Sequence, residues 1–279
     1  MTGRKKSPAP YLATGFRDVD GTGDTSACTR CLDLLSDIPF FHDIKAESFH
    51  IIAGTDPALV LDAGCGAGSD LCALAPLLPT SGRIVGLDAS ASLLATASGR
   101  TAAHRDRSVL LRGDLTNIPC RSGVFSACRI DRVLQHIPDP GRVIGELARV
   151  LAPGGTLIAF DNDWDTLAIG MSTTDASARL TRFWSDSFAA GRVGKDLAAL
   201  FRDAGLADIH VEKRTLTITD LPLAEKVFDI PALLCRMKQA GIFADNDIAA
   251  IRNDLSRRAG AGTFTSGYTG YLVWGKKPE

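Results

Sequence analysis

The fold of this chain is decided by the stretch Val60-Leu61-Asp62-Ala63-Gly64-Cys65-Gly66-Ala67-Gly68. An apolar run at 58–61 precedes the three glycines, and a helical pattern at 69–78 follows them. Glycine lets the backbone turn sharply from a strand into a helix, and its missing side chain lets a ligand approach the main chain. The stretch therefore predicts a buried strand, a ligand-binding glycine loop and a helix. A tight turn without a ligand is the alternative interpretation of such a motif.

Strands and helices alternate around this stretch. Strands are expected at 59–62, 83–87, 109–112, 124–129 and 156–160, with helices at 69–78, 90–104 and 142–151. Such alternation indicates right-handed crossovers between parallel strands. Two further strand patterns, at 206–219 and 264–274, enclose a helical insertion at 223–259, so the final strand has no crossover after it. We therefore expect an α/β fold with a doubly wound, mostly parallel seven-stranded sheet and an antiparallel last strand.

The composition is that of an ordinary globular protein. The 279 residues are 45% hydrophobic and 23% charged, and 31 Lys and Arg nearly balance 32 Asp and Glu. This balance disfavours nucleic acid as a partner, because no basic excess would hold the phosphates. No apolar run reaches the roughly 20 residues that span a bilayer, and the first residues lack the apolar stretch of a secretory signal. We therefore expect a cytoplasmic protein that binds a small molecule and no membrane.

The seven cysteines favour reduced thiols over a disulfide framework. Cys28 and Cys31 form a CxxC pair, but no second pair or nearby histidine completes a zinc site. We therefore predict no metal ion.

Acidic residues follow the first three expected strands. Asp88 lies twenty residues beyond Gly68, the spacing of a carboxylate that binds both hydroxyls of a ribose. Asp114 ends the third strand, and Asp62 lies just before the glycine turn. An NAD(P)-dependent oxidoreductase is the alternative function, but Ser69 takes the third glycine position and Asp62 would repel a pyrophosphate. A ligand with a ribose, a base amine and a positive charge fits better, and S-adenosylmethionine has all three.

Five motifs occur in order along the chain. They are Asp62-Ala63-Gly64-Cys65-Gly66-Ala67-Gly68, Gly86-Leu87-Asp88-Ala89-Ser90, Arg112-Gly113-Asp114-Leu115, Val133-Leu134-Gln135-His136-Ile137-Pro138-Asp139-Pro140 and Arg149-Val150-Leu151-Ala152-Pro153-Gly154-Gly155. Together they resemble class I S-adenosylmethionine-dependent methyltransferases, in the small-molecule branch that includes quinone-biosynthesis and natural-product enzymes. The resemblance is strong at 58–160 and looser at the last strand. One departure is Phe125-Ser126 at the start of the fourth strand, where the family usually has Phe-Asp.

The resemblance implies methyl transfer from S-adenosylmethionine to oxygen, nitrogen or carbon of a small acceptor, in secondary metabolism or quinone-like biosynthesis. It places the methionine part of the cofactor at the glycine loop, the ribose at Asp88 and the adenine amine at Asp114. The implied cofactor-binding residues are Asp62, Gly64, Cys65, Gly66, Asp88, Ala89, Ser90, Gly113, Asp114, Leu115 and Asp131. A protein of this fold that binds S-adenosylmethionine without methylating, as a cyclase or a regulator, is a further alternative.

His136 is the candidate catalytic base, because the pKa of histidine suits proton removal from an acceptor near neutral pH. The alternative is a helix residue that is hydrogen-bonded to backbone near the crevice. His42 and His50, on the expected amino-terminal helices, are further candidates for the pocket.

Asp161, Asp163 and Trp164 follow the fifth strand, where doubly wound folds bind ligands, so we expect them to contact the acceptor. A solvated loop anchored by Trp164 is the alternative.

One domain is expected at 10–279, after a flexible tail at 1–9. It comprises a helical cap at 10–56, the cofactor-binding core at 57–162 and the rest of the sheet at 163–279. Helical insertions at about 166–200 and 221–262 are expected to form a lid over the acceptor. A homodimer interface is the alternative use of these helices.

Overall fold

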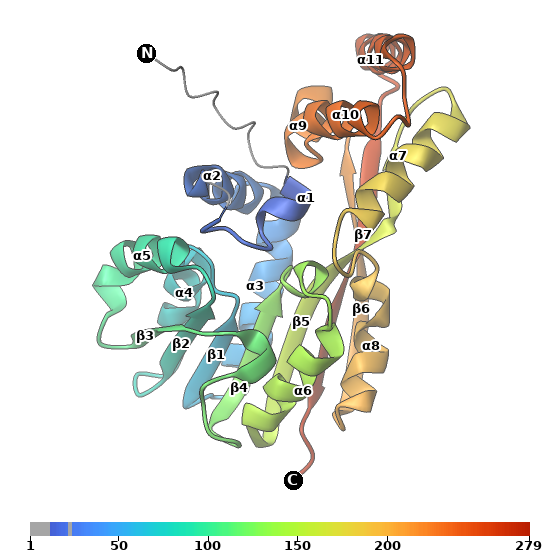
Figure 1. The fold of residues 1–279 in the computed structure, drawn as a ribbon. Helices are drawn as coiled ribbons and strands as arrows, with labels where there is room; N and C mark the ends of the chain where they lie inside the picture. The colour runs from blue at the N-terminus through green and yellow to red at the C-terminus, as the bar shows by residue number, and fades with distance from the viewer. Residues whose placement is uncertain (1–11, 22–23) are drawn as a thin grey trace.

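The computed structural model describes residues 12–21 and 24–279, so the tail predicted at 1–9 lies outside the described part of the chain. Its centre is a seven-stranded sheet in the order β3-β2-β1-β4-β5-β7-β6 (Figure 1). The strands are β1 (Leu59–Ala63), β2 (Arg83–Asp88), β3 (Ser108–Arg112), β4 (Phe125–Asp131), β5 (Leu151–Ile169), β6 (Ala207–Ile218) and β7 (Ser266–Lys276).

Strands β1 to β5 pair in parallel, and β7 runs antiparallel to both of its neighbours, β5 and β6. This confirms the predicted doubly wound sheet with its antiparallel last strand. The strand order reverses between β1 and β4, and a ligand crevice opens at the carboxyl ends of the strands at such a point.

Strand β5 is much longer than the predicted strand at 156–160. Its start pairs with β4 across a register shift between Phe125 and Ala127, which accommodates the glycines at 154 and 155. Its second half continues because β7 pairs with it at Asp161↔Tyr271 and again at Ile169↔Ser266. The expectation that Asp161, Asp163 and Trp164 follow the end of the fifth strand is therefore wrong, and so is its alternative of a solvated loop: all three lie inside β5.

Ser126 joins the beginnings of β1 and β4. Its hydroxyl oxygen accepts from the Leu59 N–H and donates to the Leu59 carbonyl, each at 3.0 Å. The serine thus makes a hydrogen-bonded link at the position where the resemblance had called for aspartate.

Helices cover both faces of the sheet (Figure 1). They are α1 (Leu12–Gly15), α2 (Thr25–Ser36), α3 (Pro39–Ala53), α4 (Ser69–Leu74), α5 (Ala91–Arg100), α6 (Pro140–Val150), α7 (Thr174–Asp186), α8 (Val193–Asp203), α9 (Leu221–Val227), α10 (Ile230–Gln239) and α11 (Asp245–Gly260). Apolar residues of α3 and α4 form one buried cluster with the sheet, and those of α6 and α8 form another on the opposite face.

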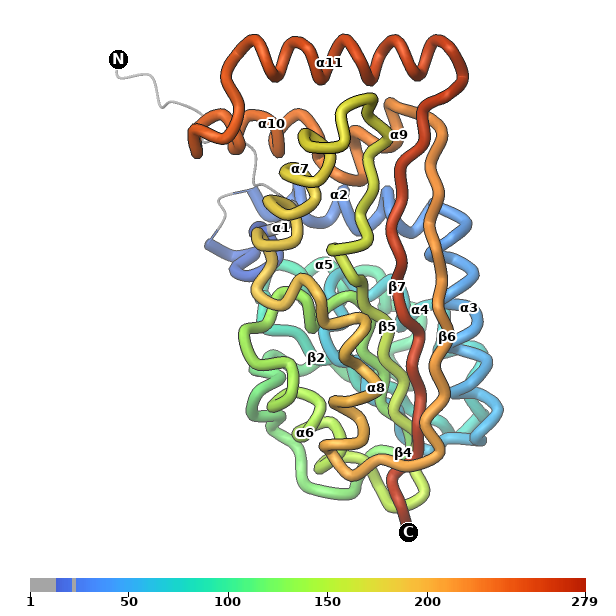
Figure 2. Tube along the Cα trace, turned by 90° about the vertical axis from the view of Figure 1, so that its right-hand side faces the viewer, coloured from blue at the N-terminus to red at the C-terminus, as the bar shows by residue number. Residues whose placement is uncertain are grey.

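Helices α1, α2, α7, α9, α10 and α11 gather at the carboxyl end of the parallel strands, whereas α5 packs beside β2 and β3. Helices α1 and α2 lie above this end of β1, β2 and β4, while α7 and α9–α11 surround the far ends of β5, β6 and β7 (Figures 1 and 2). Parts of the predicted cap and insertions, α1, α2, α7 and α9–α11, therefore lie where the crevice opens, whereas α3 and α8 cover the faces of the sheet. No helix in the described part of the chain is long and apolar enough to cross a membrane.

Candidate active site

A cavity of about 450 Å³ lies at the carboxyl ends of the strands, under α2 and beside α7 and β7. One end is formed by the glycine loop and the ends of β2 and β3. The other end is aromatic. The residues used below that line it are Phe16, Arg17, Cys31, Phe41, Gly64, Gly66, Asp88, Ala89, Gly113, Asp114, Leu115, Asp131, Arg132, Gln135, His136, Asn162, Trp164, Trp184, Phe188, Val227 and Tyr268.

The glycine loop presents bare backbone to this cavity. Gly64 and Gly66 have φ of 75° and 52°, in the left-handed region that favours glycine. A Cβ at Gly64 would lie 2.4 Å from Val133 Cγ2, so a larger residue would also collide with the segment after β4. The loop therefore requires glycine for its turn and for its close packing.

Asp88 stands at the end of β2 and faces the cavity. One of its carboxylate oxygens accepts from the Gly66 N–H and the other from the Ser90 N–H, each at 2.9 Å. Burial raises its pKa, against the effect of these backbone hydrogen bonds. The carboxylate is thus held rigidly between the two loops that border it, and its remaining lone pairs can accept from a ligand.

Asp114 lies at the end of β3, beside Gly113 and Leu115. One of its oxygens accepts from the Thr116 N–H at 2.8 Å and caps the short 3-10 helix Leu115–Asn117. All three residues, with Ala89, belong to the cavity wall. These side chains form an acidic and partly apolar border, which suits the hydroxyls and base of a nucleoside.

Three predicted cofactor residues, Asp62, Cys65 and Ser90, do not line the cavity. Asp62 is buried and pairs with Arg129 at 3.0 Å, which disagrees with the expectation that it binds the cofactor directly. Cys65 is buried in the core, and the Ser90 hydroxyl caps α5 by accepting from the Leu93 N–H. The structural reason in each case is a protein partner that uses the side chain.

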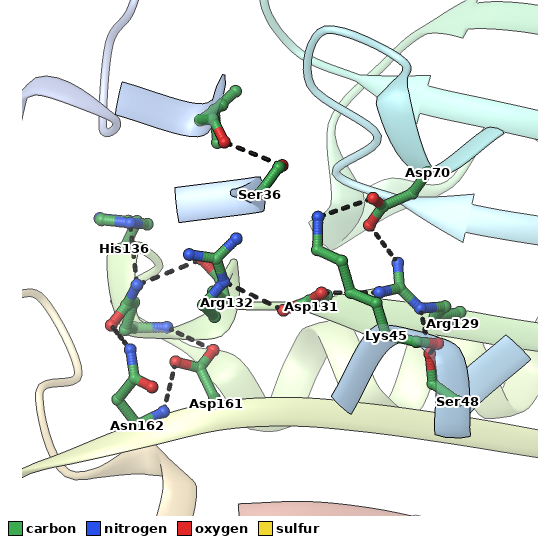
Figure 3. Close-up of polar contacts among 12 residues, drawn as sticks. Ser36, Lys45, Ser48, Asp70, Arg129, Asp131, Arg132, His136, Asp161 and Asn162 are labelled. Carbon is green, nitrogen blue, oxygen red and sulfur yellow. Dashed lines mark hydrogen bonds and ion pairs between the residues drawn. The ribbon is translucent and has the colours of Figure 1, made fainter. Parts of the chain in front are cut away.

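Arg129 is the centre of a buried charge network that the sequence reading missed (Figure 3). It contacts Asp62 at 3.0 Å, Asp70 at 2.9 Å and Asp131 at 2.6 Å, and Lys45 of α3 reaches Asp70 at 2.6 Å. Asp62 and Arg129 are direct partners on β1 and β4, so they share one face of the sheet. An arginine within the apolar β4 was the signal in the sequence, because buried arginines need acidic partners.

Aromatic side chains form the far end of the cavity. Trp164 stacks on Phe188 at 5.2 Å between ring centroids, contacts Tyr268 at 4.4 Å and meets Trp184 edge-on at 5.5 Å. Phe188 follows α7, and Val227 of α9 also lines the wall. The predicted lid therefore contributes to this end through α7 and α9. The hydroxyl of Tyr268 is buried and has no hydrogen-bond partner among the described residues.

The residues of β5 alternate between the cavity and the opposite face. Asn162 and Trp164 line the cavity, whereas Asp161 and Asp163 do not. Asp161 is completely buried and accepts from the backbone N–H groups of Gln135 and Asn162. The expectation that both acids contact an acceptor therefore does not agree with their positions. Trp164 lies in the cavity wall, and its contact with an acceptor stays a prediction.

His136 lies in the cavity wall, in the 3-10 helix Leu134–His136, with its ring between Phe16 and Phe188. Gln135 determines which ring nitrogen of His136 carries the proton in the neutral form. The Gln135 Oε1 accepts from the indole N–H of Trp164 at 2.7 Å, so its amide Nε2 is the group that lies 3.2 Å from His136 Nε2. His136 Nε2 must then accept, and the ring proton is on Nδ1.

Burial and the nearby guanidinium groups of Arg17 and Arg132 lower the pKa of His136 to about 3, so the ring is neutral near pH 7. Its Nδ1 is buried and has no partner among the described residues. A ring whose Nε2 is engaged and whose Nδ1 carries a proton is a hydrogen-bond donor. This disagrees with the expectation that His136 acts as a base. His42 and His50, the further candidates, are exposed and lie outside the cavity wall.

Arg132 follows β4 with a φ of 56°, an uncommon left-handed conformation for a side-chain-bearing residue. Its backbone N–H donates to the Phe160 carbonyl at 2.7 Å, which helps to hold this conformation. Its Nε donates to Asp131 at 3.2 Å, and its guanidinium lies 4.4 Å above the ring of Phe41. Arg132 therefore lies in the cavity wall in a conformation that both its backbone and its side-chain contacts hold.

Phe16, Arg17 and Val19, which precede α2 in the chain, also line the cavity. Asp20 accepts from the backbone N–H groups of Ala91 and Ser92 and so fastens this segment to the start of α5. Arg17 donates to the Ser187 carbonyl at 2.8 Å, next to the aromatic end. The sequence predicted a helical cap at 10–56, but no signal in it marks Phe16 and Arg17 as wall residues.

Comparisons with known proteins agree with this geometry. A family model described as a methyltransferase domain matches residues 61–159. A demethylmenaquinone methyltransferase of Geobacillus sp. (strain WCH70) is 30% identical over 183 residues, which are 60% of this chain and 78% of that protein.

Two further proteins are similar over more of the chain. A 37.1 kDa protein in transposon TN4556 of Streptomyces fradiae is 36% identical over 214 residues, which are 76% of this chain; the chain spans 61% of that protein's length. The crystal structure of the YcgJ protein from Bacillus subtilis covers 85% of this chain and 99% of its own, with a TM-score of 0.60 and 19% identity. That last likeness shows a shared fold.

Proposed function

Since this chain belongs to the class I S-adenosylmethionine-dependent methyltransferases, we propose that it transfers the methyl group to a planar aromatic acceptor held at the aromatic end of its cavity. The observation that carries the proposal is the continuity of the cavity. Gly64, Asp88 and Asp114 at the cofactor end line the same cavity as Trp164 and Tyr268 at the aromatic end.

The residues at the glycine-loop end suit the cofactor. S-adenosylmethionine, when bound, supplies a methyl group on a positively charged sulfur, which is a good leaving group. Gly64 and Gly66 leave main chain bare for the methionine part, and Asp88 presents a fixed carboxylate to the ribose hydroxyls. Asp114 and Leu115 border the place of the base.

The residues at the aromatic end suit a flat ring. Trp164, Phe188 and Tyr268 offer ring faces and edges, and aromatic rings pack favourably on such surfaces. The relatives named demethylmenaquinone methyltransferase take a quinone-type acceptor by name, which supports a ring compound of quinone-like or secondary metabolism here.

For methyl transfer the protein has mainly to align the acceptor with the methyl group and to exclude water. Phe16 and α2 cover the cavity, and Trp184 and Phe188 close its side. His136 then acts as a donor that orients an acceptor oxygen through its Nδ1–H, and Asn162 and Tyr268 offer further polar atoms.

The test is methylation of three probes, 2-naphthol, 2-naphthylamine and cyclohexanol, by purified protein with S-adenosylmethionine. We expect S-adenosylhomocysteine and a methylated product with an aromatic probe, and none with cyclohexanol. Binding of S-adenosylmethionine without S-adenosylhomocysteine formation from any probe would contradict the proposal.

Trp164→Leu supplies the matched variant, and Trp274→Leu, outside the cavity wall, is its control. Turnover of the aromatic probe should fall at least about tenfold in the first and stay unchanged in the second. Equal losses in both would contradict an acceptor site at Trp164.

A further inference from the structure

The charged groups of the cavity wall are divided between its two ends. Asp88 and Asp114 border the cofactor end, whereas Arg17 and Arg132 border the aromatic end around His136. Asp131 pairs with Arg132 at 3.2 Å and with Arg129 at 2.6 Å, whereas Arg17 donates to the Ser187 carbonyl and forms no ion pair with a described residue. The aromatic end is therefore the positive end of the cavity.

The guanidinium of Arg132 has free N–H groups that can bind an oxygen ligand. Its side chain is 11% exposed, and one face of its guanidinium lies on Phe41. Only its Nε is hydrogen-bonded, to Asp131, so the two terminal nitrogens have no hydrogen-bond partner among the described residues. Such a planar edge with free N–H groups matches a carboxylate or phenolate.

Two further donors lie on the same wall. His136 offers its Nδ1–H and Tyr268 its hydroxyl, and both atoms are buried without a partner among the described residues. Unsatisfied buried donors cost free energy in the empty cavity, which a ligand that accepts from them recovers. Donors and positive charge thus coincide at the aromatic end.

We propose that the acceptor binds as an aromatic anion, a ring that carries an ionised phenolate or carboxylate oxygen, and that Arg132 is the residue that selects it. Arg17 reinforces the positive charge from the cap, and His136 and Tyr268 donate to the same or a neighbouring oxygen. This inference rests on the proposed function, because it concerns the acceptor of that reaction.

The experiment compares 2-naphthoate with 2-naphthamide, which share rings and shape but differ in charge. Binding of each to the protein saturated with S-adenosylhomocysteine is measured by calorimetry. Wild-type protein should bind naphthoate at least tenfold more tightly than naphthamide. Equal affinities, tighter binding of the amide, or no binding of either probe would overturn the proposal. The affinity for 2-naphthol is also measured at one pH above and one pH below the pKa of its hydroxyl, which distinguishes phenolate from carboxylate recognition.

Arg132→Gln removes the charge and should abolish the preference for naphthoate, while affinity for S-adenosylhomocysteine changes less than threefold. Arg121→Gln, on an exposed residue outside the cavity wall, is the control and should keep the preference. A tenfold loss of S-adenosylhomocysteine affinity with the preference intact would instead assign Arg132 to the cofactor carboxylate and overturn the proposal.

If Arg132→Gln does not fold, Arg17→Gln replaces it and should reduce the preference at least threefold. Failure of wild-type protein to bind S-adenosylhomocysteine at all would reject the proposed function itself. Binding of S-adenosylhomocysteine without a charge preference would reject the acceptor inference alone.

Discussion

Asp88 is the residue on which cofactor affinity should depend most directly. Its carboxylate is already oriented by the Gly66 and Ser90 backbone N–H groups, so a ribose meets a fixed acceptor. A charge-assisted hydrogen bond contributes roughly 1.5–3 kcal/mol. Asp88→Ala should therefore weaken S-adenosylhomocysteine binding about 10- to 100-fold in a calorimetric titration. The exposed Asp106→Ala is the control, and an unchanged affinity of Asp88→Ala would show that the ribose lies elsewhere.

His136 should work as a donor and not as a base. Asparagine places an amide N–H near the position of the imidazole Nδ1–H, whereas leucine keeps the bulk and offers no donor. His136→Asn should therefore keep turnover within about tenfold of wild type, and His136→Leu should lose about 10- to 100-fold. Removal of a true base costs about 10²- to 10⁴-fold in both variants. Equal and severe losses of turnover in the two variants would show that His136 acts as a general base.

At the scale of elements, β5 decides which side chains reach the cavity. Its second half is held as a strand by β7, so neighbouring residues point to opposite faces. Asn162 and Trp164 face the cavity, and Asp161 is left in the interior with hydrogen bonds from Gln135 and Asn162. Strand β5 thus supplies two side chains of the cavity wall and, directly before the first of them in the sequence, a buried acid.

The buried acid should make stability depend on pH. Burial raises the pKa of Asp161 to about 7, against about 3.9 in an unfolded chain. Between these values the folded protein keeps a proton that the unfolded chain releases. The contribution of this group is therefore complete below about pH 4 and is lost as pH rises through about 7.

Asp161→Asn carries no such proton. The unfolding free energy of wild type relative to this variant should fall by on the order of 4 kcal/mol from pH 4 to pH 8, measured by urea denaturation. Asp106→Asn, at an exposed position, should show no comparable trend. A wild-type-to-Asp161→Asn difference that is constant with pH would mean that Asp161 is already ionised when buried.

For the whole molecule, the sequence predicted the sheet and its antiparallel last strand, because strand and helix periods and glycine turns are local signals. It also predicted that Gly64, Gly66, Asp88 and Asp114 meet, since the carboxyl ends of parallel strands share one edge. It could not predict that Asp62 faces Arg129, which depends on the register between β1 and β4. Asp161 points away from the cavity and into the interior because β5 pairs with residues about 110 positions later, which no local pattern reveals.

Residues of α2, the glycine loop, α7 and α9 line one cavity, so a bound cofactor should stabilise the whole fold. S-adenosylhomocysteine at 100 times its dissociation constant adds about 2.7 kcal/mol to the unfolding free energy. We expect a clear rise in Tm in a thermal shift assay, and none with NAD at the same concentration. A shift with NAD alone would favour the dinucleotide alternative.

The place of β7 has a consequence for how the molecule is made. This strand is the last of the seven in the chain, yet it lies between β5 and β6, and β6 pairs with no other strand in the described structure. On a ribosome, the half of the sheet from β1 to β5 can assemble early, but β6 stays unpaired until residues 266–276 leave the exit tunnel. Distant pairings of this kind form slowly, and the aromatic pocket to which Tyr268 belongs is completed only with them. A chain interrupted shortly before that strand would keep its nucleoside-binding edge but would lack both a finished substrate wall and protection against edge-to-edge aggregation.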